Sequence, residues 1–146
     1  MRAVAACLLA ASSLLASCAP AAHDGPAGDD LACARFGARP GIEISLLFGL
    51  SRPDGRPITD AEWHDFLSRA VTPRFPDGLS VFQASGQWRD RTSLRITSEP
   101  SRIVWIAADA RAPGLAARLD AVRAQYRRDF QQQSVGLVLR AGCQAF

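Results

Sequence analysis

The spacing of apolar residues changes along the chain in a way that predicts four strands and two helices. In the segment 42–50, "IEISLLFGL", apolar residues occupy every second position, which is the period of a strand with one buried face. The segments 79–88, 103–108 and 134–140 have strand character too. The polar stretch between 88 and 103 predicts a hairpin whose second arm begins near 94–97. Two further segments repeat their apolar residues every three or four positions, as helices do: Trp63, Phe66, Leu67 and Ala70 in the first, and Leu115, Leu119, Val122, Tyr126 and Phe130 in the second.

Local signals mark the start of the first helix. Thr59 and Glu62 match the T-x-x-E capping box. In this motif the side chain of each residue accepts a hydrogen bond from the backbone N–H of the other. Ile58 and Trp63 occupy the flanking positions of a hydrophobic staple. These four residues predict that the helix begins directly after Thr59.

The stretch 71–80, "VTPRFPDGLS", is dense in prolines and charges and predicts the end of the first helix. Pro73 is expected to force Thr72 out of helical geometry and stop the helix there. The following "FPDG" at 75–78 predicts a type I turn that leads into the second strand. The pattern assigns no role to Arg74.

The order of the elements is β-α-β-β-α-β, which predicts an α+β fold of the ferredoxin-like, split βαβ type. We expect an antiparallel sheet in the order 4-1-3-2, with right-handed crossovers that place both helices on one face. The other face of the sheet then lies open.

The N-terminal segment has the pattern of a targeting signal. Arg2 precedes an uncharged apolar run that is too short to span a membrane comfortably, and the run ends in "LASC" at 15–18, which resembles a bacterial lipobox. We therefore expect a signal peptide at 1–17, a lipidated Cys18 with a Pro/Gly/Ala-rich tether at 18–32, and one domain at 33–146. Ala19 favours sorting to the outer membrane, facing the periplasm, although a Gram-positive envelope and simple secretion with cleavage after Ala21 stay open.

Two cysteines, Cys33 and Cys143, remain for the domain once Cys18 is lipidated and Cys7 is removed with the signal. In an oxidising compartment, two such thiols more often pair than stay free. The expected topology also places the start of the first strand beside the end of the fourth, so we predict a Cys33–Cys143 disulfide that joins the two ends of the domain.

Composition and charge exclude several classes of function. The seventeen basic residues are all arginine, and the net charge of +3 is spread along the chain without the clustered basic face that nucleic-acid binding requires. Nucleophile-elbow, phosphate-loop and zinc-protease motifs are absent. His23 and His64 are the only histidines and no C-x-x-C spacing occurs, so we expect neither a metal nor a cofactor.

The motifs along the chain resemble those of a bacterial family catalogued as domain of unknown function 3574. The resemblance rests on five strings in order: "LFGLSRPDG" at 47–55, "ITDAEWHDFL" at 58–67, "VTPRFPDGLSV" at 71–81, "GQWRD" at 86–90 and "SEPSRIVWI" at 98–106. It implies a small secreted protein, often a lipoprotein, and it implies no reaction.

The expected topology brings several polar side chains to one rim, at the tip of the hairpin. This candidate ligand site comprises Arg52, Gln87, Trp88, Arg89 and Glu99, a set suited to an anionic or sugar-like ligand. The alternative interpretation is structural: Trp88 packs against Trp63 or the hairpin, and Arg89 and Glu99 form a cross-strand ion pair.

Two functions remain open at this point. The first, which the absence of catalytic motifs favours, is a lipid-anchored envelope module that binds a small ligand or a protein. The second is a small cofactor-free envelope enzyme that uses the hairpin rim or a cavity in a homodimer formed through the open sheet face, a suggestion that rests on fold analogy.

Overall fold

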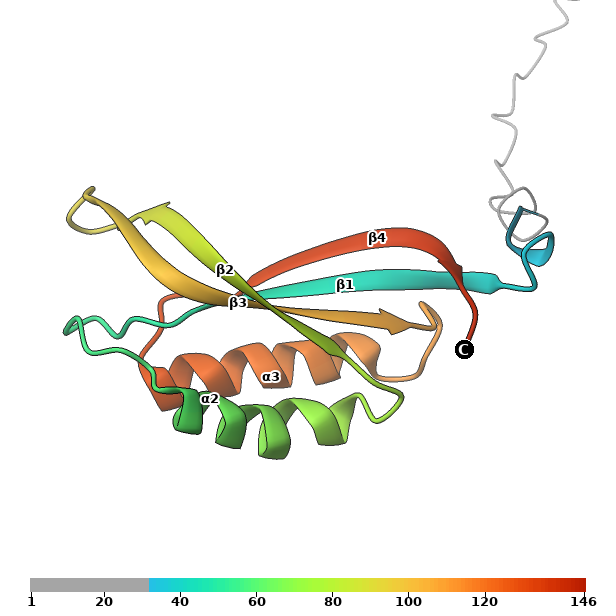
Figure 1. Cartoon of the computed structure of the whole chain (residues 1–146), viewed down its shortest axis with the longest axis horizontal. Coiled ribbons are helices and arrows are strands. Elements are labelled where there is room, and N and C mark those ends of the chain that lie inside the picture. The colour runs from blue at the N-terminus through green and yellow to red at the C-terminus, as the bar shows by residue number, and fades with distance from the viewer. Residues whose placement is uncertain (1–31) are drawn as a thin grey trace, which may run out of the picture.

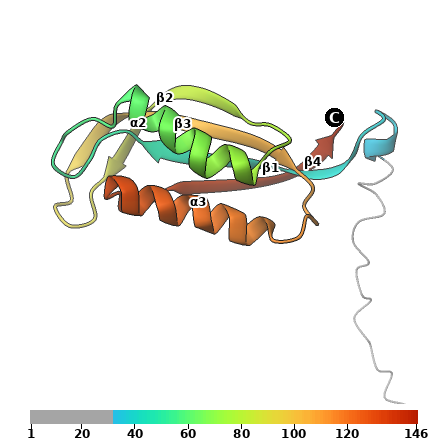
Figure 2. The ribbon, with the colours of Figure 1, turned by 90° about the horizontal axis from the view of Figure 1, so that it is seen from below.

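The computed structural model describes residues 32–146, and it has the predicted architecture (Figure 1). One four-stranded antiparallel sheet has the order β2-β3-β1-β4. Figures 1 and 2 show both long helices against the same face of this sheet. The ferredoxin-like order 4-1-3-2 is thereby confirmed. The elements are β1 (Arg39–Gly49), α2 (Asp60–Phe66), β2 (Ser80–Arg89), β3 (Ile96–Ala108), α3 (Leu115–Phe130) and β4 (Gly136–Gln144).

The core lies between the sheet and the helices because the strands alternate as the sequence predicts. Ile44, Leu46 and Phe48 of β1 are fully buried on the helix side. In the register of the sheet, Val104 and Ile106 of β3 stand opposite Leu46 and Ile44, so they bury the same face. The intervening residues of each strand point to the open face.

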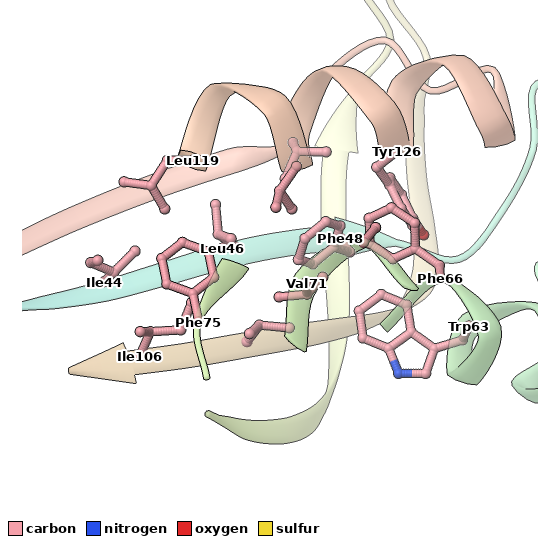
Figure 3. Close-up of a cluster of buried hydrophobic side chains, with 14 of the residues drawn as sticks. Ile44, Leu46, Phe48, Trp63, Phe66, Val71, Phe75, Ile106, Leu119 and Tyr126 are labelled. Carbon is pink, nitrogen blue, oxygen red and sulfur yellow. The ribbon is translucent and has the colours of Figure 1, made fainter. Parts of the chain in front are cut away.

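An aromatic cluster joins the helices to β1 (Figure 3). Phe48 makes edge-on contacts with Trp63, Phe66 and Tyr126, with ring centroids 5.2, 5.9 and 4.7 Å away. Such geometry adds roughly 0.5–1.5 kcal/mol per pair to the free energy of burial. Trp63 therefore belongs to the core beneath the sheet.

The start of the first helix is as predicted, but its end is not. The capping box is present, with Thr59 accepting from the Glu62 N–H and Glu62 accepting from the Thr59 N–H. The prediction for Thr72 is wrong, because this residue keeps helical angles of φ −53° and ψ −42°. Pro73 has no N–H to donate, and the chain adapts by widening into a π-turn at Leu67–Val71 and then tightening into a 3₁₀ turn at Thr72–Arg74.

The loop after this helix has the expected turn, and the structure assigns a role to Arg74. The Gly78 N–H donates to the Phe75 carbonyl at 3.3 Å, which closes the turn over 75–78. The guanidinium of Arg74 donates to the Ala70 carbonyl. The backbone carbonyl of Arg74 accepts from the guanidinium of Arg118. Arg74 therefore satisfies backbone groups at the end of the helix.

A disulfide between Cys33 and Cys143 joins the two ends of the domain, as predicted. It closes a loop with a sequence separation of 110 residues. The strand pairings, the core cluster and this bridge all lie within residues 33–144, so this segment has a core of its own. Within residues 32–146, no helix has the length and hydropathy needed to cross a membrane. The expected signal peptide, the lipidated Cys18 and most of the tether, with His23, lie outside the described residues.

Candidate functional site

The open face of the sheet is hollowed near the hairpin because three strands carry a glycine there. Gly49 of β1, Gly86 of β2 and Gly136 of β4 all belong to the open face in the observed register. A hollow of about 170 Å³ lies over this region. It adjoins a larger hollow of about 540 Å³ between the hairpin and the loops 51–53 and 131–133.

We call these joined hollows the hairpin groove and define it by the residues that line its shared part. Two hydrogen bonds fix its walls: the Gln132 side chain donates to the Ser51 carbonyl at 2.8 Å, and the Gln133 side chain donates to Asp90 at 2.8 Å. The groove is thus built from three separate segments of the chain. Its defining residues are Trp88, Glu99, Gln132 and Gln133, and Ser51 lines the larger hollow beside them.

Glu99 is the half-buried carboxylate of this groove. Its Oε2 accepts the Ser51 N–H at 2.9 Å. Its carboxylate lies directly against Gly49, where an added Cβ would come within 2.5 Å of Oε1. Within residues 32–146, Oε1 has no hydrogen-bond partner, so this oxygen is free to accept from a ligand.

Trp88 stands on the same face as Glu99 and close to it in register. Trp88 pairs with Thr97, and Glu99 pairs with Gly86, so the two side chains are diagonal neighbours across the hairpin. Because Gly86 has no side chain, nothing on β2 separates the indole from the carboxylate. The pair presents an aromatic surface beside a hydrogen-bond acceptor.

Arg52 lines the groove, but its charge is already engaged. Its guanidinium donates to Glu62 at 2.6 Å and to the Pro57 carbonyl at 2.7 Å, and it stacks on Phe130. The side chain is only 13% exposed. The hydrogen bond from the Thr59 N–H, with that from Arg52, lowers the pKa of Glu62 to about 2. Arg52 therefore positions the 51–57 loop and leaves little charge for an anionic ligand.

A phenol lies directly beneath the floor of the groove. Tyr126 donates to the Gly49 carbonyl at 2.8 Å. Burial, with a smaller contribution from the negative charge of Glu99, raises the pKa of Tyr126 far above its usual value. The phenol stays protonated and holds the backbone on which Glu99 rests.

Two of the five predicted rim residues do not reach the groove. Gln87 and Arg89 point to the opposite face of the hairpin, and Gln87 donates there to Ser98 at 3.2 Å. For the same reason the expected ion pair between Arg89 and Glu99 is absent from residues 32–146. Of the two structural alternatives for Trp88, packing on Trp63 is wrong, because Trp63 lies in the core on the helix side of the sheet and Trp88 on the open face. Packing on the hairpin stays a prediction.

Sequence reasoning missed the backbone and amide parts of this site. The expected topology brings the loops 51–57 and 131–133 to the hairpin rim, but no local pattern singles out Ser51, Gln132 and Gln133 within them. The glycines near the hairpin-side ends of three predicted strands, in "LFGL", "ASGQ" and "SVGL", were the available signal. No set of three or more metal-ligating side chains is grouped anywhere in residues 32–146.

The open face also carries exposed apolar side chains. Leu47, at the edge of the smaller hollow, and Phe82 and Val138 farther from it are 41%, 54% and 47% exposed. All three belong to this face in the observed register. The homodimer expected through this face stays a prediction.

Comparison with known proteins defines the family and the fold. A family model described as "Protein of unknown function (DUF3574)" matches residues 43–146. No curated protein matches the chain. Two solved structures are similar to this chain. A phage SAM lyase in complex with S-methyl-5'-thioadenosine has a TM-score of 0.59 and 18% identity, and the match covers 72% of this chain and 85% of that one. A phage SAM lyase in the apo state has a TM-score of 0.53 and 18% identity, and the match covers 73% of this chain and 86% of that one. At this identity the likeness shows the fold alone.

Proposed function

This chain belongs to the DUF3574 family, whose description assigns no function, and we propose from its geometry that it is a ligand-binding module of the bacterial envelope. The binding site is the hairpin groove. The observation that carries the proposal is the half-buried Glu99, held by the Ser51 N–H with one oxygen free, in a hollow that Gly49 leaves open. This oxygen is accessible in the groove, so a ligand that donates to it gains a charge-assisted hydrogen bond.

The charges around the groove select the class of ligand. Arg52 is paired with Glu62, and Asp90 accepts from Gln133 and from the backbone of the hairpin tip. Glu99 is then the charged acceptor without a partner in the shared part of the groove. Beside Glu99 and Trp88, a cationic or hydroxyl-bearing ligand with a flat face fits well. Of the anionic or sugar-like ligands expected from the sequence, these two residues favour the sugar-like class, whereas Arg95 lies elsewhere along the larger hollow.

A cofactor-free enzyme is the second candidate, and the free Oε1 of Glu99 is the observation that favours it. A carboxylate held in a groove is placed to accept a proton from a bound molecule. The similar fold titled a phage SAM lyase suggests probes for both candidates, namely S-adenosylmethionine and S-methyl-5'-thioadenosine. The first of these carries a cationic sulfonium and a flat adenine.

We also propose that the protein is anchored by lipid. Residues 1–17 act as a signal peptide, Cys18 carries the acyl chains, and the domain faces the periplasm from the outer membrane. The lipobox at 15–18 supports this arrangement. Intact-mass spectrometry of the protein purified from membranes tests it: the chain should start at Cys18 and carry acyl groups, and an unmodified chain starting at another residue would contradict it.

The groove is tested by thermal-shift screening of the protein against cationic and hydroxyl-bearing envelope metabolites, including the two probes above. We expect a ligand that raises the Tm of the wild type but not of Glu99→Gln, which keeps the shape and removes the charge. Glu43→Gln is the matched control, because Glu43 lies exposed on the same open face far from the groove. Product analysis of each stabilising compound separates binding from turnover. Equal stabilisation of all three proteins would overturn the assignment of the groove.

A further inference from the structure

The end of the domain opposite the hairpin exposes two phenylalanines. Phe36 and Phe146 are 80% and 89% exposed, more than any other large apolar side chain described. The segments that carry them, 32–38 before β1 and 145–146 after β4, lie at one end of the sheet because Arg39 pairs with Gln144, and Figure 1 shows the C-terminus at the end where β1 begins. An exposed pair of this kind at one end of a domain marks a surface that meets something apolar.

The turn that presents Phe36 is held firmly in place. The Cys33 carbonyl accepts from the N–H groups of Phe36 and Ala38, both at 3.0 Å. Cys33 is itself fixed to Cys143 by the disulfide, which ties the turn to the end of β4. The exposure of Phe36 therefore belongs to a defined turn that the bridge pins to the sheet.

Three arginines belong to the same end of the domain: Arg39 and Arg111 line a hollow beside Cys33, and Arg35 precedes Phe36 in the sequence. Arg35, Arg39 and Arg111 are exposed, and none of the ion pairs within residues 32–146 involves them. Asp109 lines a hollow with Arg39 and Arg111, and Asp77 lines another with Arg39 and Phe146. The sequence also places Asp29 and Asp30 just before this end. The net charge is thus small, and the apolar contact of the two rings is the main attraction.

The position of Cys18 in the sequence identifies the partner. Thirteen residues, 19–31, separate Cys18 from Ala32. Even fully extended, they place Ala32 within roughly 50 Å of Cys18, at ~3.6 Å per residue. An anchor at Cys18 therefore attaches the domain to the bilayer at this end, whereas the hairpin groove lies at the far end of β1, roughly 35 Å away at ~3.3 Å per residue. Because this distance is shorter than the extended tether, a second contact is needed to orient the domain.

We propose that Phe36, Phe146 and the three arginines of this end form a membrane-docking surface whose partner is the phospholipid bilayer. The rings enter the interfacial region and the guanidinium groups contact lipid phosphates, as in other interfacial anchors. Docking in this way turns the hairpin groove away from the bilayer, toward the aqueous compartment. The proposal rests on the proposed lipid anchor, because one such surface alone gives only weak, reversible binding.

Vesicle co-sedimentation of residues 32–146 measures this surface without the anchor. The vesicles are phosphatidylcholine, with or without about a third of phosphatidylglycerol, at millimolar lipid. We expect measurable binding that falls about tenfold or more in the double variant Phe36→Ser/Phe146→Ser, since burial of each ring contributes substantially to partitioning. The matched control is Leu94→Ser/Ile96→Ser, which removes two apolar side chains of 62% and 69% exposure from the hairpin end.

The outcomes separate this proposal from the proposed function. Loss of binding in the phenylalanine variant alone, with unchanged circular dichroism, supports the docking surface. Absence of wild-type binding, or an equal loss in both double variants, overturns it. Cys18 is not part of the measured protein, so the mass of the native chain tests lipidation separately. The ligand screen tests separately whether the hairpin groove binds a ligand.

Discussion

Substitution of Gly49 tests how the groove is built. An alanine Cβ at this position would come within 2.5 Å of Glu99 Oε1 and 2.9 Å of Oε2. Both distances are shorter than the contacts that a Cβ makes with non-bonded atoms in proteins. The flexible end of the Glu99 side chain is the part that yields, so Gly49→Ala should push the carboxylate out of the groove. The Ser51 N–H then loses its acceptor.

The size of the effect follows from two opposing terms. Loss of a charge-assisted hydrogen bond in a half-buried setting costs roughly 1.5–3 kcal/mol. Replacement of glycine by alanine in a strand returns roughly 0.5–1 kcal/mol. The net loss in the free energy of unfolding is therefore about 1–2 kcal/mol. At roughly 3–5 °C per kcal/mol for a domain of this size, the Tm should fall by about 3–10 °C.

A double-mutant cycle isolates the cause. With Glu99→Ala already in place there is no carboxylate to displace, so Gly49→Ala should become neutral or stabilising, which is a coupling of about 2 kcal/mol. Gly86→Ala is the matched control, because its Cβ would find its nearest neighbour at 3.6 Å and needs no rearrangement. Urea unfolding of the four proteins measures the cycle. If Gly49→Ala costs the same with and without Glu99, the reasoning is refuted.

Three further predictions concern stability. Removal of the Cys33–Cys143 bridge by paired serine substitution should cost about 3–5 kcal/mol on the chain-entropy estimate for so long a loop, measured by urea unfolding, and a cost below about 1 kcal/mol would contradict it. Tyr126 is the only tyrosine, and its raised pKa means that the folded state favours the neutral phenol; stability should fall as the pH rises above about 10, and phenolate absorbance should appear only with unfolding. A phenolate signal from the folded protein near pH 10 would show that Tyr126 is accessible. The pKa of Glu62 is lowered from 4.5 to about 2, so the ionised side chain stabilises the fold above pH 4.5. In the wild type this contribution should be lost as the pH falls from 4.5 to 2, and in Glu62→Gln it should be missing at every pH. The pH dependence of the Tm of both proteins measures the difference.

Much of the fold was predictable because its signals are local and mutually consistent. The alternation of β1, the capping box of Thr59 and Glu62 and the helical period of α3 each depend on residues close in sequence. The position of Cys33 and Cys143 then agreed with the topology. The end of the first helix was not predictable in this way, because tertiary packing of Val71 in the core outweighs the preference of the residue before Pro73.

The candidate site was predictable only in part. The sequence placed Arg52, Trp88 and Glu99 at one rim, and these three do line the groove. Gln87 and Arg89 were misplaced, because successive residues of a strand point to opposite faces, so both lie on the face opposite Trp88.

The sequence by itself determined the class of fold, the order of the strands and the disulfide, since hydrophobic period, capping and turn residues act over a few positions. Only the tertiary structure decided which charges are free. Arg52 is neutralised by Glu62 from the start of α2, whereas Glu99 keeps an unpaired oxygen because glycines on two neighbouring strands leave space around it. That difference depends on contacts between segments far apart in the chain, and it is the reason why the proposed ligand donates hydrogen bonds to Glu99.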